Sequence, residues 1–287
     1  MPNAQSSIPN TQRRRFAIIN GDDFGFSQGV NQAIIQAYEQ GVLTSTSLMV
    51  TGDAAEEAIA LASDRPNLGI GLHLVLVCGR SVLPPKQIPH LVDSKGNFSD
   101  SPLQAGLRYQ FHPAAREELH QEIRAQLEKF RDSQLPLSHV DGHLHLHTHP
   151  VILRILVDLA QEFDIRVIRL PSEELGMNLK LNTQKLITKL VWAAVFDRLR
   201  RYGENLLRYH GIKFADRVYG LLETGNITEE YLLGLIPQIE ANFVEIYSHP
   251  AVKPDDIELA ALLSEQVREA LNVNGFELTN YIKRGEP

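Results

Sequence analysis

The feature that most constrains the fold is an alternation of short apolar runs with segments of helical periodicity. Apolar runs occupy residues 16–20, 44–50 and 68–77, and helical patterns at residues 27–40 and 53–64 separate them. Short buried strands that alternate with helices are typical of parallel βαβ units. The sequence therefore predicts an α/β fold, and its 287 residues are a length that an α/β barrel uses as one domain.

The alternation continues along the rest of the chain, with two interruptions. We expect a helix at 113–134, a strand at 139–147, a helix at 150–163 and strands at 165–170, 244–248 and 275–281. Residues 81–110 are rich in Pro, Gly, Asp and Ser, which indicates a long loop over the site. Residues 173–224 mix apolar helical patterns with basic residues, which indicates a helical insertion packed on the barrel. The alternative is an amphipathic helical segment that covers the site and binds an apolar substrate or a membrane surface.

Charge and cysteine content narrow the class of protein. The net charge of −7 argues against nucleic acid as a partner, because phosphate binding needs a concentrated basic surface. Cys78 is the single cysteine, which fits a reducing compartment, and we expect a cytoplasmic protein. Residues 1–15 are expected to form a flexible tail without the apolar core of a secretory signal. No run is apolar for long enough to span a membrane, although peripheral contact with the inner membrane stays open.

Two adjacent carboxylates, Asp22 and Asp23, directly follow the first expected strand. In parallel α/β folds this carboxyl edge of the sheet carries the active site. Two neighbouring carboxylates repel each other, and a bound cation removes that repulsion. One carboxylate can then bind metal while the other acts as a base. The alternative is an Asp that caps the next helix.

The densest chemical signal is the segment HVDGHLHLH at residues 139–147. Alternate side chains of a strand share a face. We therefore expect one face to carry five titratable groups: His139, Asp141, His143, His145 and His147. Residues i and i+2 lie roughly 6.6 Å apart on a strand, whereas a metal–nitrogen bond is about 2.1 Å. Two of these histidines can share one ion, and the others must orient ligands, contact substrate or move protons.

Three isolated residues complete the candidate site. His73 lies between two leucines in an apolar strand, where a hydrogen-bonded core histidine is the alternative. His249 follows the strand at 244–248 and is a candidate general acid, because imidazole carries a proton near neutral pH. Arg169 is expected to hold a substrate oxygen or a ligand carboxylate, or to form a surface ion pair. One Asp and two His around an ion suit hydrolysis, and they equally suit a non-haem iron oxygenase.

These residues carry a family resemblance. The segments NGDDFG, VNQAIIQAYEQGVLTSTSLMV, GLHLVL, HVDGHLHLH and SHP resemble the YdjC-like carbohydrate deacetylases of the ChbG/HpnK type. The segments GLHLVLVCGRSVLPPKQIPHLVD and LRYQFHP are most similar to the hopanoid-biosynthesis-associated HpnK branch. The resemblance implies one distorted (β/α) TIM-like barrel of the glycoside hydrolase/deacetylase type over residues 16–287, with the helical insertion at about 173–224. It also implies a homodimer.

The resemblance also implies a reaction and a role for each candidate residue. The reaction is metal-dependent removal of the acetyl group from an N-acetylated amino sugar, either an oligosaccharide or a hopanoid-linked N-acetylglucosamine. Asp23, His73 and His143 fall on the ligands of one divalent cation, with Mg or Zn favoured; Asp22 falls on the base and His249 on the acid. The substrate-binding or supporting residues would be His139, Asp141, His145, His147 and Arg169. Gly21 replaces the alanine usual in the family motif, and no ligand is lost.

Three other interpretations stay open from the residues themselves. One is the non-haem iron oxygenase with the same three ligands. Another is a barrel that binds sugar or metal without turnover. The third is a glycosidase, which needs two carboxylates flanking one bond. The histidine-rich face argues against the third.

Overall fold

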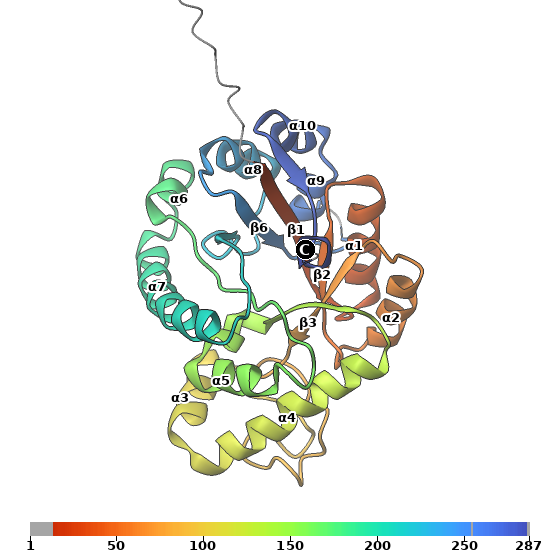
Figure 1. The fold of residues 1–287 in the computed structure, drawn as a ribbon, viewed down its shortest axis with the longest axis vertical. Coiled ribbons are helices and arrows are strands. Elements are labelled where there is room, and N and C mark those ends of the chain that lie inside the picture. The colour runs from red at the N-terminus through yellow and green to blue at the C-terminus, as the bar shows by residue number, and fades with distance from the viewer. Residues whose placement is uncertain (1–13, 254, 286–287) are drawn as a thin grey trace, which may run out of the picture.

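A curled parallel sheet forms the centre of the computed structural model, which describes residues 14–253 and 255–285 (Figure 1). Neighbouring strands follow the order β4-β3-β2-β1-β6-β5, β7 pairs with β1, and each of these pairs is parallel. The strands are β1 Arg15–Phe24, β2 Ser45–Leu48, β3 Gly69–Leu74, β4 Leu137–Gly142, β5 Arg217–Tyr219, β6 Phe243–Ser248 and β7 Phe276–Leu278. The predicted α/β fold of the distorted-barrel type is thus confirmed.

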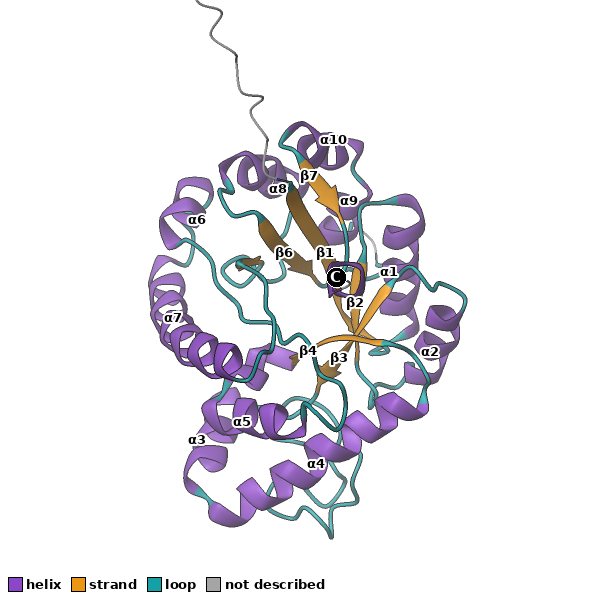
Figure 2. Cartoon of the chain, in the orientation of Figure 1, coloured by secondary structure: helices purple, strands orange, loops and turns teal. Residues whose placement is uncertain are grey.

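Helices surround the sheet as an outer ring (Figure 2). They are α1 Gln28–Gln40, α2 Ala55–Ser63, α3 Pro102–Phe111, α4 Pro113–Asp132, α5 Pro150–Leu159, α6 Leu175–Leu181, α7 Leu186–Tyr209, α8 Glu229–Leu235, α9 Ile257–Leu263, α10 Glu265–Val273 and α11 Tyr281–Gly285, with short 3-10 helices η1 His143–Thr148 and η2 Ile236–Gln238. Helix α1 begins as predicted, because the Ser27 hydroxyl accepts a hydrogen bond from the amide of Val30. Within the described residues, no helix combines the length and apolar character needed to cross a membrane.

Strand β1 organises the sheet. Strand β6 pairs with it from Phe16 to Gly21, whereas β7 pairs with its first residues and β2 with its last. The register with β2 shifts between Gly21 and Phe24, so the strand is irregular where the two aspartates lie. The carboxyl ends of β1, β3, β4 and β6 therefore carry the polar residues that the sequence singled out.

The barrel is distorted on the side between β4 and β5. The strand predicted at 165–170 is wrong as a regular strand, since this segment forms only isolated bridges from Val167 and Ile168. Its backbone still lies beside β4, because Val140 donates to Val167 O and Arg169 donates to Val140 O, both at 3.0 Å. The proline at 171 has no amide hydrogen with which to continue the ladder.

Other expectations need smaller corrections. The loop predicted at 81–110 ends in helix α3, and the last strand is Phe276–Leu278 rather than 275–281. Residues 173–224 contain α6, α7 and β5; their identity as an insertion stays a prediction. Of the tail predicted at 1–15, residues 1–13 lie outside the described residues.

Candidate metal site and its surroundings

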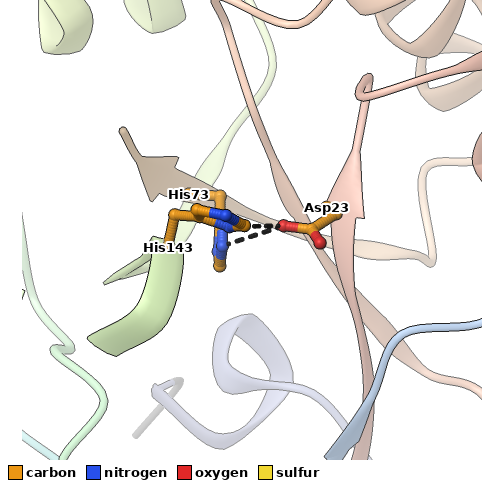
Figure 3. A group of neighbouring side chains, drawn as sticks. All are labelled: Asp23, His73 and His143. Carbon is orange, nitrogen blue, oxygen red and sulfur yellow. Dashed lines mark hydrogen bonds and ion pairs between the residues drawn. The ribbon is translucent and has the colours of Figure 1, made fainter. Parts of the chain in front are cut away.

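Three strand ends bring together one carboxylate and two imidazoles (Figure 3). Asp23 comes from β1, His73 from β3, and His143 from the residue directly after β4. Asp23 Oδ1 lies 3.2 Å from His73 Nε2 and 3.0 Å from His143 Nδ1. One ligating atom from each residue falls within 4.8 Å of the others, which is the spacing of a shared metal ion.

The backbone at Asp23 explains how two adjacent aspartates reach different surroundings. Asp23 has φ of 66°, a left-handed conformation that residues other than glycine seldom adopt. The Asp23 side chain is 17% exposed and faces the histidines, whereas that of Asp22 is 1% exposed and points into the barrel. Such backbone strain costs about 1–3 kcal/mol and concentrates at functional sites. The two carboxylates are therefore separated by the chain itself.

The buried carboxylate of Asp141 orients His73. The Nδ1–H of His73 donates to Asp141 Oδ1 at 2.8 Å, and buried Nε2, facing Asp23, has no hydrogen-bond partner among the described residues. Burial acts to lower the pKa of His73, but Asp141 and Asp23 outweigh it and raise that pKa to about 10. The pocket thus favours a positive charge at this position. A divalent cation on Nε2 would supply that charge, so the donor set fits a metal.

Arg169 forms a buried ion cluster beneath the three candidate ligands. Its guanidinium contacts Asp22 through both terminal nitrogens at 2.7 and 2.8 Å, Asp141 at 2.8 Å and Glu245 at 2.6 Å. Burial acts to lower the pKa of Arg169, but these three carboxylates raise it well above its usual value. Arg169 is fully buried, which excludes the surface ion pair. It contacts the carboxylates of Asp22, Asp141 and Glu245 rather than that of the candidate ligand Asp23.

The ion cluster around Arg169 favours one of two possible cation positions over the other. A second group of potential ligands, Asp22, His73 and Asp141, shares His73 with the first. Its two carboxylates are already paired with Arg169, and all three side chains are buried. Asp23 and His143 keep partly exposed side chains. We therefore favour the group of Asp23, His73 and His143, which a substrate can approach.

His249 lies beside Asp22, after the end of β6. Its Nε2 is 4.0 Å from Asp22 Oδ2, and its Nδ1 is 3.9 Å from Oε2 of Glu258 in α9. The backbone amide of His249 also donates to Glu258 at 2.6 Å. The His249 side chain is 29% exposed, so it can reach both solvent and the buried carboxylate. Glu258 holds this turn in place.

The remaining histidines of HVDGHLHLH do not share one strand face, and that expectation is wrong beyond Gly142. Leu144 and His145 have φ of 51° and 55°, a left-handed turn that ends the strand. His145 Nε2 shares a hydrogen bond with the Tyr247 hydroxyl at 2.7 Å, and His147 Nε2–H donates to the backbone oxygen of Arg169 at 2.9 Å. Burial is the main cause that lowers the pKa of both, that of His147 to about 4. Both are therefore neutral supports at neutral pH.

His139 and Asp141 do share a face, as predicted. His139 Nε2 lies 3.2 Å from Ser47 Oγ, and the Ser47 hydroxyl donates to Asp141 Oδ2 at 2.7 Å. Sequence reasoning missed Ser47, Glu245 and Glu258. Glu245 alternates with apolar neighbours in β6 and so had a detectable inward-facing pattern. Glu258 has no such signal, because acidic residues are common in a first helical turn.

Comparisons with known proteins identify related chains. Residues 16–273 match the family model described as YdjC-like protein. The chain is 40% identical to a carbohydrate deacetylase of Geobacillus stearothermophilus over 205 residues, which are 71% of this chain and 74% of that one. It is 26% identical to a carbohydrate deacetylase of Thermoanaerobacter pseudethanolicus over 93% of this chain and 98% of that one.

A solved structure is similar over nearly the whole chain. It is the crystal structure of an Enterococcus faecalis V583 protein named for cellobiose-phosphate cleavage, with a TM-score of 0.71 and 26% identity. The match covers 94% of this chain and 99% of that one.

Proposed function

Because the chain belongs to the YdjC-like protein family, we propose that it is a carbohydrate deacetylase, a metal-dependent hydrolase that removes the acetyl group from an N-acetylated amino sugar. The observation that carries the proposal is the convergence of Asp23, His73 and His143 at the carboxyl edge of the sheet. The unpartnered Nε2 of His73 points into that group.

In this proposal Asp23, His73 and His143 hold one divalent cation, with magnesium or zinc as first candidates. When bound, such a cation polarises the amide carbonyl and makes a water molecule more acidic. Among the described residues, the carboxylates around this position belong to Asp22, Asp23, Asp141 and Glu245, and one guanidinium, that of Arg169, lies among them. That excess of negative charge favours a cation.

We assign the general base to Asp22. Its Oδ1 accepts hydrogen bonds from Asn20 and Arg169, and its Oδ2 accepts one from Arg169. A carboxylate oxygen offers two lone-pair positions, so Oδ2 keeps one free among the described residues. This oxygen also faces His249. Arg169 thus orients Asp22 and leaves it one site for a proton taken from water.

We assign the general acid to His249. In the proposed reaction, water attacks the acetyl carbon while Asp22 removes its proton, and a tetrahedral oxyanion forms. His249 then donates a proton to the sugar nitrogen as the carbon–nitrogen bond breaks. The products are acetate and a free amino sugar. The partial exposure of His249 suits this role, because the leaving nitrogen arrives from the solvent side.

The proposal also includes the acceptor and the setting of the reaction. The acceptor is an oligosaccharide or a hopanoid-linked N-acetylglucosamine, and the resemblance of residues 71–93 to the HpnK branch supports the second. We propose a location in the cytoplasm, because a single cysteine, Cys78, fits a reducing compartment. We also propose a homodimer, which the family resemblance implies.

Acetate release tests the proposed function. The purified protein is incubated with soluble and lipid-linked N-acetylglucosamine compounds, with chelator, and after addition of each metal in turn. We expect release that chelator abolishes and a divalent metal restores. Release that chelator does not affect would refute the metal site, whereas oxygen consumption with added iron would indicate an oxygenase.

A further inference from the structure

The first three turns of α7 expose an apolar face. Six large apolar side chains within residues 186–195 are exposed, and the exposed fraction reaches 78% at Ile187 and 55% at Val191. They are Leu186, Ile187, Leu190, Val191, Trp192 and Val195. The buried side of the same helix is formed by Lys189, Arg200, Gly203 and Leu207. The exposed face thus points away from the barrel, although solvated helix faces are normally polar.

This face adjoins the wall of the candidate site. The ring of Phe196 lies 5.8 Å from that of His145, and the ring of Trp192 lies 5.9 Å from that of Phe196. His145 in turn contacts Tyr247, whose ring lies beside that of His249 at 5.7 Å. Trp192 therefore connects the apolar face, through Phe196, to the residues around the proposed acid.

Unpaired cations surround the apolar face. Lys180, Lys185 and Arg198 are exposed, and none has a carboxylate within ion-pair distance in the described part of the chain. The one acidic residue of this stretch of helix, Asp197, is paired with Arg201. This region is positive although the whole chain carries a net charge of −7. The face therefore complements a surface that is both apolar and anionic.

We propose that residues 180–198 dock the protein onto an anionic phospholipid bilayer. A helix with this composition lies in the interface with its apolar side chains at the boundary of headgroups and acyl chains. Lys and Arg at its edge are attracted to anionic headgroups, and a Trp is favoured at the same depth. A second copy of the chain would bury the apolar side chains but would need carboxylates opposite all three cations. Docking brings Trp192 to the bilayer surface, and Trp192 contacts the wall of the candidate site through Phe196 and His145.

Vesicle co-sedimentation tests the proposal without any turnover, so it is independent of the proposed deacetylase function. The full chain is mixed with vesicles of phosphatidylcholine alone or of equal parts phosphatidylcholine and phosphatidylglycerol. We expect stronger binding to the mixed vesicles, and weaker binding as salt increases. The double variant Ile187→Glu/Val191→Glu should lose at least about tenfold in vesicle affinity. Its matched control, Val273→Glu on α10, replaces a valine that is 69% exposed and should bind as the wild type does.

A second variant tests the charges. Lys180→Gln/Lys185→Gln/Arg198→Gln should weaken binding to the mixed vesicles by about fivefold for each cation removed, and Lys86→Gln, an exposed lysine elsewhere, should not. Circular dichroism checks that each variant is folded. If the wild-type protein bound neither type of vesicle, the proposal would be overturned. So would light scattering that shows the Ile187→Glu/Val191→Glu variant to be a monomer and the wild type a dimer, because the face would then bind a second copy.

Discussion

Replacing Asp141 by Asn tests whether the buried carboxylate prepares His73 to bind metal. Asp141 now accepts a hydrogen bond from His73 on one oxygen and from Ser47 on the other, and the second oxygen also forms an ion pair with Arg169. In the variant, the amide oxygen is expected to turn toward the Arg169 donors, which leaves the amide nitrogen facing His73 Nδ1. The amide nitrogen donates, so Nδ1 of His73 must accept that hydrogen bond and the imidazole proton moves to Nε2. A protonated Nε2 cannot bind metal.

The expected effect is a loss of about 10–100-fold in metal affinity, the usual range for partners that orient a ligand. That range corresponds to about 1.4–2.7 kcal/mol. Competition between the metal-free protein and a chromophoric chelator for zinc measures it directly. At saturating zinc, the rate of acetate release by the variant should fall by less than its zinc affinity does, because Asp22 and His249 are unchanged.

The matched control is Ser47→Ala. It removes the hydroxyl that donates to Asp141 at 2.7 Å but leaves the carboxylate charge and the His73 hydrogen bond in place. We expect zinc affinity within about threefold of the wild type, although unfolding becomes easier by about 1 kcal/mol. If Asp141→Asn bound zinc as tightly as the wild type, or Ser47→Ala lost as much, the orienting role of Asp141 would be wrong.

Three further predictions concern the acid, the base and pH. Asp22→Asn should reduce acetate release by about 10²–10⁴-fold while zinc binding persists; full activity with zinc bound would exclude Asp22 as the base. His249→Gln should lower kcat by at least about 10²-fold with little change in KM, measured by initial rates. Because the folded pKa of His147 is about 4 against an ordinary 6.5, the unfolded chain binds more protons between these values. The free energy of unfolding should therefore fall by about 2 kcal/mol from pH 7 to pH 5 through this residue, and urea unfolding of His147→Gln should lack that part of the slope.

The fold was predictable where local pattern and tertiary environment agree. Apolar runs of strand length located β1, β2, β3 and β6, and Ser27 marked the start of α1. The prediction of a regular strand at 165–170 was wrong because the hydrophobic pattern is that of a strand, but the segment pairs with its neighbours only through isolated bridges, to Val140 and to Lys213. Helix α3 was overlooked because the polar composition of its surroundings concealed the two buried positions Ala105 and Tyr109.

The candidate site was predictable in its location and less so in its connections. The rule that active sites lie at the carboxyl ends of parallel strands located Asp23. The family resemblance grouped it with His73 and His143, and the structure brings the three to within ligand spacing. Their roles stay predictions. The ion cluster around Arg169 was not predictable, because its partners Asp22, Asp141 and Glu245 come from three strands that only the closed sheet brings together.

The histidine segment shows how a left-handed turn alters a prediction that rests on strand geometry. On an extended strand, at most two of these histidines could share an ion. The strand ends at Gly142, however, so this spacing does not apply to the histidines that follow it. A Cβ at this glycine would lie 3.0 Å from the backbone oxygen of Leu74, so a larger residue would crowd β3. The left-handed turn that follows sends His143 toward Asp23, His145 toward Tyr247 and His147 toward the backbone of Arg169. Of this segment, His143 lies within ligand spacing of Asp23 and His73, because the backbone directs His145 and His147 to separate buried partners.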